Sequence, residues 1–362
     1  MKKMKVSVVT GTRPEIIKMS SVIRELEWGN FSFFILHTGQ HYSYYLDKIF
    51  FKELELPEPK YNLEVGSGSH AWQTGKILIG IEKILLEEKP DVVLVEGDTN
   101  SVLAGALAAA KLDINVGHIE AGLRSNDKNM PEELNRILTD HLSDYLFAPT
   151  DKARDNLISE GIHTENIYIT GNTIVDAVHQ NAKIAQRKSQ VLDELGLKQR
   201  EYFLVTVHRQ ENVELEERMK GILEGLGLVY QKFRLALIYP IHPRASRSIK
   251  KFGLEIPSGV KLIEPVGFLD FLTLETNAAL ILTDSGGIQE ESCILNVPCV
   301  TLRDSTERPE TIEAGSNVLA GASPEVILNS VKRMLPVKRE WQNPFGDGKT
   351  GNRIVNILID RF

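Results

Sequence analysis

Cysteine is nearly absent from this chain of 362 residues: there are two, Cys293 and Cys299, and neither stands in a CxxC pair. Two cysteines without such spacing exclude a disulfide framework and a cysteine-ligated zinc site. Long hydrophobic runs are missing too, because no stretch reaches the roughly 18 apolar residues that a membrane-spanning helix needs. The first residues are too polar for a secretory signal. We therefore expect a cytoplasmic protein with no membrane partner.

A surplus of positive charge is also missing. Lysine and arginine number 42 against 49 acidic residues, which gives a net charge of −7. Proteins that bind nucleic acid present a basic face to the phosphate backbone, so nucleic acid is not an expected partner. Any anionic ligand must be held by a few local cations and by helix N-termini.

Signatures of common cofactors are absent as well. The stretch "GSGSHA" lacks the third glycine of a dinucleotide fingerprint, and "NPFGDGKT" has Asn343 where a P-loop begins with glycine. No HExxH motif occurs. We expect neither a metal nor a nicotinamide cofactor.

What the chain does have is a regular alternation of short β-branched runs and longer helical patterns. This alternation is typical of parallel, doubly wound α/β sheets. The expected strands are residues 5–10, 31–36, 91–96, 115–120, 144–149, 166–171, 202–207, 235–240, 260–265, 278–283 and 298–302.

The strands fall into two series, and 362 residues exceed one ordinary core. We expect an α/β fold of two Rossmann-like domains with a cleft between them. Residues 1–172 form the first domain, and residues 173–350 form the second, beginning with a long polar helix. Residues 351–362 form a final helix that packs back on the first domain. Ligands of such sheets bind at the carboxyl ends of the strands.

Polar residues follow several strands of the first series. "GTRPEIIK" places Arg13 and Lys18 in a strand-to-helix turn, "GDTNS" places Asp98, and "TGQH" places Gln40 and His41. Helix N-termini and arginine forks attract anions. A capped turn explains each of these segments as well, and the sequence alone leaves both interpretations open.

One segment of the first series, "VGHIEAGLRSNDKNMPEELNR", is unusually rich in charge. It gathers Glu120, Glu132 and Glu133 near Arg124 and Arg136. Clustered carboxylates transfer protons and stabilise cationic sugars. The two arginines either orient the acids or serve the fold alone.

The second series carries the sharpest nucleotide signal. In "ILTDSGGIQEES" a strand ends, Asp284 and Ser285 form a turn, and Gly286 and Gly287 free the backbone for a phosphate. Glu291 lies one turn into the helix that follows, where a carboxylate suits ribose. "LVTVHRQEN" adds His208, whose ordinary pKa near neutrality suits proton transfer.

Eight motifs taken together, in this order, resemble the non-hydrolysing UDP-N-acetylglucosamine 2-epimerases. They run from Gly11 to about Gly351: "GTRPEIIK", "TGQH", "GDTNS", "HIEAGLRS", "PEELNR", "HRQEN", "DSGGIQEE" and "TERPE". The resemblance implies a GT-B-type fold, a homodimer, no cofactor, and interconversion of UDP-N-acetylglucosamine with UDP-N-acetylmannosamine.

The resemblance also implies roles for particular residues. The catalytic residues would be Asp98, Glu120, Glu132 and His208. The nucleotide-sugar would be bound by Arg13, Lys18, Phe271, Ser285, Gly286, Gly287, Glu291 and Arg308, with Phe271 near the uracil. A second, activating substrate molecule would contact Gln40, Gln73, Arg209 and His242.

The implied chemistry is elimination of UDP to 2-acetamidoglucal, followed by re-addition with a proton delivered to the other face of C2. Two proton-handling groups near C2 are then needed, which the acids supply. The sequence leaves open which acid removes the proton. The alternatives are a GT-B glycosyltransferase, a hydrolysing epimerase that releases UDP and N-acetylmannosamine, and a catalytically silent nucleotide-sugar sensor.

Overall fold

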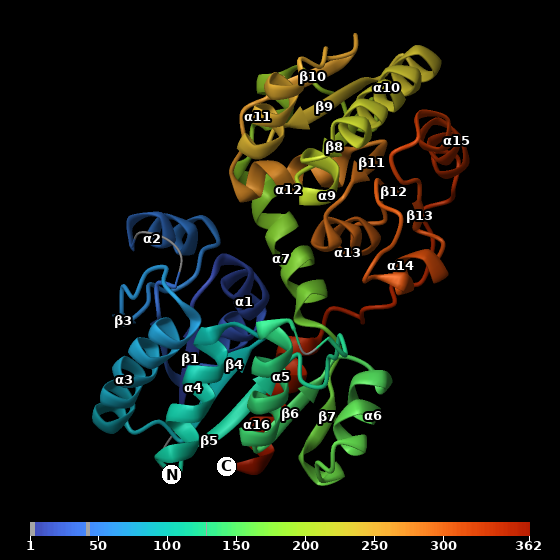
Figure 1. The fold of residues 1–362 in the computed structure, drawn as a ribbon. Coiled ribbons are helices and arrows are strands. Elements are labelled where there is room, and N and C mark those ends of the chain that lie inside the picture. Colours follow the sequence, from blue (N-terminus) through green and yellow to red (C-terminus); the bar gives the residue numbers. More distant parts are fainter. Residues whose placement is uncertain (1–3, 41–43, 128) are drawn as a thin grey trace. The chain divides into compact units, whose positions relative to one another are not determined.

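The computed structural model describes residues 4–40, 44–127 and 129–362, and the chain divides into two compact units (Figure 1). The first unit contains Met1–Ala177 and Phe345–Phe362, and the second contains Val178–Pro344. The chain passes from one unit to the other within helix α7 (Thr173–Lys188), a few residues from the expected boundary. His41, singled out in the sequence, lies outside the described residues.

Within its described residues, the first unit is built on a parallel seven-stranded sheet. The sheet order is β3-β2-β1-β4-β5-β6-β7, so the direction of winding reverses at the neighbouring strands β1 and β4. At such a reversal the connections leave in opposite directions, and an open α/β sheet binds its ligand there. The strands are β1 (Lys5–Thr10), β2 (Ser32–His37), β3 (Tyr61–Asn62), β4 (Val92–Glu96), β5 (Asn115–Ile119), β6 (Tyr145–Ala148) and β7 (Ile167–Ile169).

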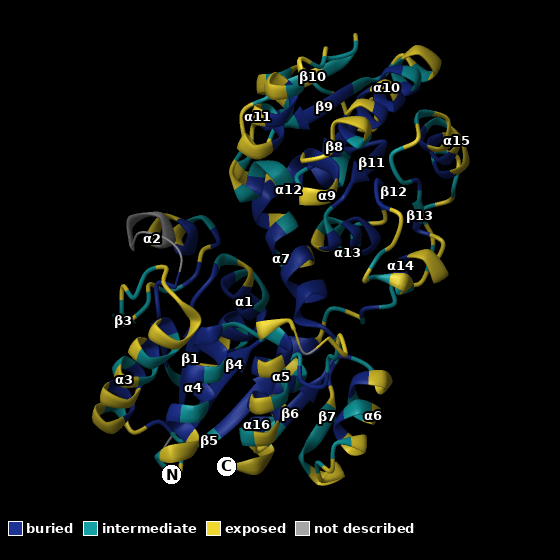
Figure 2. Ribbon diagram, in the orientation of Figure 1, coloured by how far each residue is buried: buried dark blue, intermediate teal, exposed yellow. Residues whose placement is uncertain are grey.

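The central strands are buried on both faces, as Figure 2 shows, because helices cover the sheet on either side. This explains why their sequences are continuous apolar runs. The helices are α1 (Arg13–Trp28), α2 (Tyr44–Glu53), α3 (His70–Glu88), α4 (Asn100–Lys111), α5 (Pro131–Leu142), α6 (Asp151–Ser159) and a 3-10 turn η1 (Thr164–Asn166).

The second unit repeats this plan. Its described strands are parallel, in the order β10-β9-β8-β11-β12-β13, with the reversal at β8 and β11. They are β8 (Tyr202–Thr206), β9 (Ala236–Pro240), β10 (Val260–Ile263), β11 (Leu280–Thr283), β12 (Cys299–Thr301) and β13 (Asn317–Leu319). The helices are α8 (Val191–Leu195), α9 (Gln210–Val213), α10 (Glu216–Phe233), α11 (Pro243–Phe252), α12 (Phe268–Asn277), α13 (Gly286–Ile294), α14 (Pro309–Glu313) and α15 (Pro324–Met334).

The C-terminal helix α16 (Thr350–Arg361) belongs to the first unit and packs against α1. The buried carboxylate of Asp176 accepts hydrogen bonds from the backbone N–H groups of Thr350 (3.1 Å) and Gly351 (3.0 Å) and so caps the helix. A Cβ at Gly351 would lie 3.0 Å from the backbone of Ser21. The close packing of α16 on α1 therefore favours glycine at this position, because an added Cβ would require the Ser21 backbone to shift.

Two edge strands, β3 and β13, were not expected from the sequence. They have two and three residues, too few to show an alternating pattern. The long polar helix expected at the start of the second domain is broken at Ser189, whose hydroxyl donates to Asp270 Oδ1 (2.6 Å). Across the described residues, no helix is both long enough and apolar enough to cross a bilayer.

Candidate functional site

Three charged groups meet at the carboxyl ends of β4 and β5 in the first unit. Lys18, on α1, places its Nζ 2.6 Å from Glu120 Oε2 and 3.1 Å from Glu96 Oε1. Glu120 has a left-handed backbone (φ 69°), and its Oε1 accepts from Asn172 Nδ2 at 3.2 Å. Burial raises the pKa of Glu96 well above its usual range, although Lys18 opposes the rise. Lys18 thus holds Glu120 in place through an ion pair.

Asp98 is held from α5. Arg136 Nη2 donates to Asp98 Oδ2 (2.5 Å) while Nη1 donates to Glu133 Oε2 (2.8 Å). The Asp98 backbone carbonyl accepts from Asn135 Nδ2 at 2.9 Å. Of the two interpretations left open for Arg136, the structure supports the one in which it orients an acid.

The neighbouring acids Glu132 and Glu133 differ in their surroundings. Glu133 is buried and accepts hydrogen bonds from the backbone N–H groups of Ser125 and Asn126. Burial would raise the pKa of Glu133, but these bonds and Arg136 outweigh it and lower the pKa. Glu132 is half-buried and has no hydrogen bond or ion pair with the described residues. Glu133 therefore shapes the loop, whereas Glu132 remains available to a ligand.

Arg124 does not orient Glu120, Glu132 or Glu133. It binds Glu160 through two hydrogen bonds (2.8 and 2.6 Å) and lies 2.7 Å from Asp140 Oδ2. Asp140 Oδ1 lies 2.6 Å from His118 Nδ1, and His118 Nε2 donates to the carbonyl of Gly97 at 2.9 Å. For Arg124 the purely structural interpretation holds.

This buried network reaches the turn that carries Asp98. Neither His118 nor Asp140 was predicted from the sequence, because a histidine inside a strand and an aspartate late in a helix give no local signal.

The turn after β1 is tightly built. A Cβ at Gly11 would lie 2.0 Å from Ser101 Oγ, so this position admits only glycine. The Gly11 N–H donates to Glu15 Oε2 at 2.5 Å, and burial raises the pKa of Glu15. Arg13 opens α1, with its guanidinium 5.6 Å from the centre of the Phe50 ring.

Gln40 and Gln73 are buried in a hydrogen-bond network. Gln40 Oε1 accepts from the N–H (3.2 Å) and hydroxyl (2.7 Å) of Ser101. Gln73 Nε2 donates to the carbonyls of Gln40 and Gly66, and its Oε1 accepts from Asn100. Both amides thus support the strand ends, and their predicted contact with an activating ligand stays a prediction.

In the second unit, buried Asp284 organises the loop after β8. Its carboxylate accepts from the backbone N–H groups of His208 (3.1 and 3.0 Å) and Arg209 (2.9 Å) and from Asn212 Nδ2 (3.0 Å). His208 Nδ1 lies 3.3 Å from Asp284 Oδ1. Burial lowers the pKa of His208, nearby cations add to this, and Asp284 opposes it.

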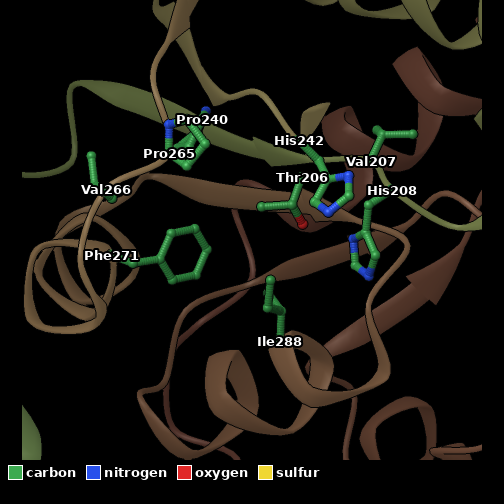
Figure 3. Close-up of a pocket in the computed structure, with 9 residues that line it drawn as sticks. All are labelled: Thr206, Val207, His208, Pro240, His242, Pro265, Val266, Phe271 and Ile288. Carbon is green, nitrogen blue, oxygen red and sulfur yellow. The ribbon is translucent and has the colours of Figure 1, made fainter. Parts of the chain in front are cut away.

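A pocket of about 200 Å³ opens at the ends of β8 and β9 (Figure 3). The Phe271 ring lies on one side and the two histidines on the other, with Ile288 below. Pockets for drug-sized ligands are larger, so this volume suits a single planar ring. The lining residues are Thr206, Val207, His208, Pro240, His242, Pro265, Val266, Phe271 and Ile288.

His242 is also a helix cap. Its Nδ1 accepts the N–H of Arg244 (3.1 Å) at the start of α11, and its ring centre lies 6.0 Å from that of His208.

The N-terminus of α13 carries Ser285, Gly286 and Gly287. Neither glycine has a left-handed backbone. Backbone freedom, expected from the sequence, is therefore not what these positions require. A Cβ at Gly286 would have its nearest atoms 3.9 Å away, so the glycines leave the helix end uncovered. Exposed N–H groups there can bind an anion.

Two further site residues lie on or near α13. Arg308 Nε is 2.5 Å from Glu290 Oε1, so an acid of α13 holds it. Burial raises the pKa of Glu291 to about 7.

Residues 24–359 match the family model described as UDP-N-acetylglucosamine 2-epimerase. The chain belongs to the UDP-N-acetylglucosamine 2-epimerase family. The two Rossmann-like units of its α/β, GT-B-type fold are as the sequence predicted.

Among family relatives, UDP-N-acetylglucosamine 2-epimerase of Methanocaldococcus jannaschii is 58% identical over 98% of this chain and 99% of that protein. A crystal structure of that organism's UDP-GlcNAc 2-epimerase with UDP-GlcNAc and UDP has a TM-score of 0.83, covering 99% of this chain and 100% of the other at 58% identity. The UDP-2,3-diacetamido-2,3-dideoxy-D-glucuronate 2-epimerase of Pseudomonas aeruginosa is 42% identical over 98% of this chain and 99% of that protein.

Proposed function

We propose that this protein is a non-hydrolysing UDP-N-acetylglucosamine 2-epimerase, which interconverts UDP-N-acetylglucosamine and UDP-N-acetylmannosamine. The observation that carries the proposal is the full-length, 58% identical relative named UDP-N-acetylglucosamine 2-epimerase. The acids at the strand ends of the first unit supply the chemistry that such a reaction requires.

In this proposal the second unit binds the nucleotide. The uracil enters the pocket beside Phe271, and the diphosphate binds the uncovered N-terminus of α13 at Ser285, Gly286 and Gly287. Glu291 accepts hydrogen bonds from the ribose hydroxyls. Arg308 turns from Glu290 to the diphosphate.

The first unit performs the chemistry at C2. One acid removes the C2 proton, the C1–O bond breaks, and the electron pair forms the C1=C2 bond of 2-acetamidoglucal as UDP leaves. A second acid returns a proton to the opposite face of C2, and a UDP oxygen bonds again to C1. Asp98, Glu120 and Glu132 are the acids available, and water takes no part.

Cationic side chains stabilise the negative charge that develops on the leaving group. Departing UDP gains negative charge on its β-phosphate, which Arg13 and Arg308 stabilise. His208 acts beside them. Its Nδ1 faces the Asp284 carboxylate at 3.3 Å, which leaves Nε2 to exchange a proton with the leaving oxygen.

The sequence prediction of a second, activating substrate molecule also stays part of the proposal. Arg209 and His242 lie beside His208 and contact this ligand directly. Gln40 and Gln73 contact it from the first unit, where their amides also support the strand ends.

We propose further that the protein acts as a cytoplasmic homodimer. On α3, Trp72, Ile79 and Leu86 recur every seven residues and are 44%, 69% and 57% exposed, so they form one apolar stripe. Exposed stripes of this kind mark interfaces. Ile79→Glu should convert a dimer to a monomer in light scattering, whereas a mass unchanged by the substitution would argue against this face.

The proposed activity is tested by incubating the protein with UDP-N-acetylglucosamine alone and separating the products. The manno epimer of the intact nucleotide-sugar is expected. Free UDP with N-acetylmannosamine would indicate a hydrolysing enzyme, and no reaction without an acceptor would favour a glycosyltransferase. Because a relative's name denotes another UDP-sugar, UDP-2,3-diacetamido-2,3-dideoxyglucuronate is assayed in parallel.

A further inference from the structure

An unused carboxyl group lies beneath the nucleotide site. Glu275, near the end of α12, is 0% exposed. Among the described residues, no N–H and no hydroxyl donates to either of its side-chain oxygens. A buried carboxylate without donors is costly, so its presence calls for an explanation.

The donors close to Glu275 are engaged elsewhere. The hydroxyl of Tyr202 donates to the carbonyl of Leu274 at 2.6 Å. The hydroxyls of Thr273 and Thr276, on the same helix, donate to the carbonyls of Leu269 and Leu272.

The polar group that does meet Glu275 is another carboxyl, that of Glu291 on α13. Neither acid forms an ion pair with a described lysine or arginine; the nearby Arg308 pairs with Glu290 instead. Two carboxyl groups in contact without a cation cannot both be ionised, and one proton shared between them gives a strong hydrogen bond.

The surroundings indicate which acid keeps the proton. Glu275 is fully buried, and its neighbours Leu274 and Ala278 belong to an apolar cluster. Glu291 is less buried and belongs to the helix whose N-terminus is open. Burial raises the pKa of Glu275 well above its usual range and that of Glu291 to about 7. The proton therefore stays on Glu275.

We propose that Glu275 is a positioning residue for nucleotide recognition: its protonated carboxyl donates a hydrogen bond to the Glu291 carboxylate. This bond favours the ionised form of Glu291 and fixes one of its oxygens, so that the other accepts the ribose hydroxyls. The inference rests on the proposed function in one respect, namely that Glu291 contacts the ribose.

The test compares binding of UDP with binding of 2′-deoxy-UDP by calorimetry. The two ligands have the same base and phosphates, so the ratio of their dissociation constants isolates recognition of the 2′-hydroxyl. A charge-assisted hydrogen bond to that hydroxyl gives a preference of about tenfold for UDP in the unmodified protein.

Two substitutions of Glu275 test whether the hydrogen bond that it donates to Glu291 supports ribose recognition. Glu275→Gln keeps a neutral donor and should retain the preference within about twofold. Glu275→Leu removes the donor while filling the space, so the preference should fall to about twofold or less. Because leucine replaces an unpaired buried acid, the melting temperature of this variant should rise. Glu275→Met serves the same purpose if the leucine variant does not fold.

The proposal is overturned if the leucine or methionine variant keeps the tenfold preference. It is also overturned if these variants bind UDP and 2′-deoxy-UDP more weakly by the same factor, as a merely structural role of Glu275 would produce. Glu291→Gln is the matched control and should lose the preference. If Glu291→Gln keeps it, the ribose assignment fails, whereas epimerase turnover of the unmodified protein reports separately on the proposed function.

Discussion

The Asp284 carboxylate offers a sharp test of how the second unit builds its site. Asp284→Asn keeps the shape of the side chain but replaces one acceptor oxygen with an NH2 group. In the native protein the His208 N–H is shared by both oxygens, and Oδ2 also accepts from the Arg209 N–H and from Asn212 Nδ2. The amide must therefore point a donor at another donor in a site with no access to water.

The expected cost follows from these contacts. A hydrogen bond to a charged group contributes about 1.5–3 kcal/mol, and an unsatisfied buried donor costs a similar amount. Losing the bond at Oδ1 and turning an NH2 group toward the His208 N–H should destabilise the second unit by about 3 kcal/mol. With a urea m-value of about 2 kcal/mol per molar, the unfolding midpoint should fall by about 1.5 M.

Tryptophan fluorescence can follow this unit alone. Of the three tryptophans, Trp341 lies in the second unit, where its indole N–H donates to the carbonyl of Cys293 at 2.9 Å. Trp28 and Trp72 belong to the first unit, and phenylalanine replaces both in the background protein, which keeps the α3 stripe apolar at position 72.

Asp270→Asn is the matched control in the same unit. This half-buried acid accepts from one hydroxyl, that of Ser189, and its replacement should cost about 1 kcal/mol or less. If Asp284→Asn moved the midpoint no further than Asp270→Asn, the assignment of Asp284 as the organiser of the His208 loop would be refuted.

Three further predictions concern the first unit. Glu120→Gln should reduce turnover at least about 100-fold, because a general acid–base group is lost. The affinity for UDP, measured by calorimetry, should stay within about twofold of the native value. Full turnover of this variant would remove Glu120 from the mechanism. Hydrogen bonds from Lys5, Lys60 and Tyr61 lower the pKa of Glu88 to about 2. The ionised Glu88 therefore stabilises the fold above the pKa that the residue has in the unfolded chain, and this stabilisation disappears as the pH falls from about 5 to 2. Glu88→Gln should therefore be less stable than the native protein at pH 7 and equally stable near pH 2 in urea titrations, whereas exposed Glu87→Gln should match the native protein throughout. Asp176→Ala should uncap α16 at a cost of about 1 kcal/mol and speed hydrogen exchange over residues 350–355, an effect that exposed Asp360→Ala should not reproduce.

The fold followed from the sequence because its signals are local. Each central strand is an apolar run bounded by a turn, and the order of strands and helices predicted two doubly wound sheets. The edge strands β3 and β13 escaped prediction because two or three residues carry no period. Their pairing depends on neighbours already in the sheet.

The partners of the charged residues could not be read in the same way. Arg124 and Arg136 stand in one motif, yet one contacts Asp140 and Glu160 and the other contacts Asp98. These partners lie up to 38 residues away, and the packing of α5 and α6 on the sheet selects them. Lys18 likewise reaches Glu120 across 102 residues.

The central claim is that acids of the first unit exchange the proton at C2 while UDP is eliminated and returned. Incubation with UDP-N-acetylglucosamine in heavy water, followed by mass spectrometry and proton NMR of the nucleotide-sugars, tests this directly. We expect one deuterium at C2 of the manno epimer. Deuterium should also appear gradually at C2 of the recovered gluco form. An epimer that retains hydrogen at C2 would contradict the central claim.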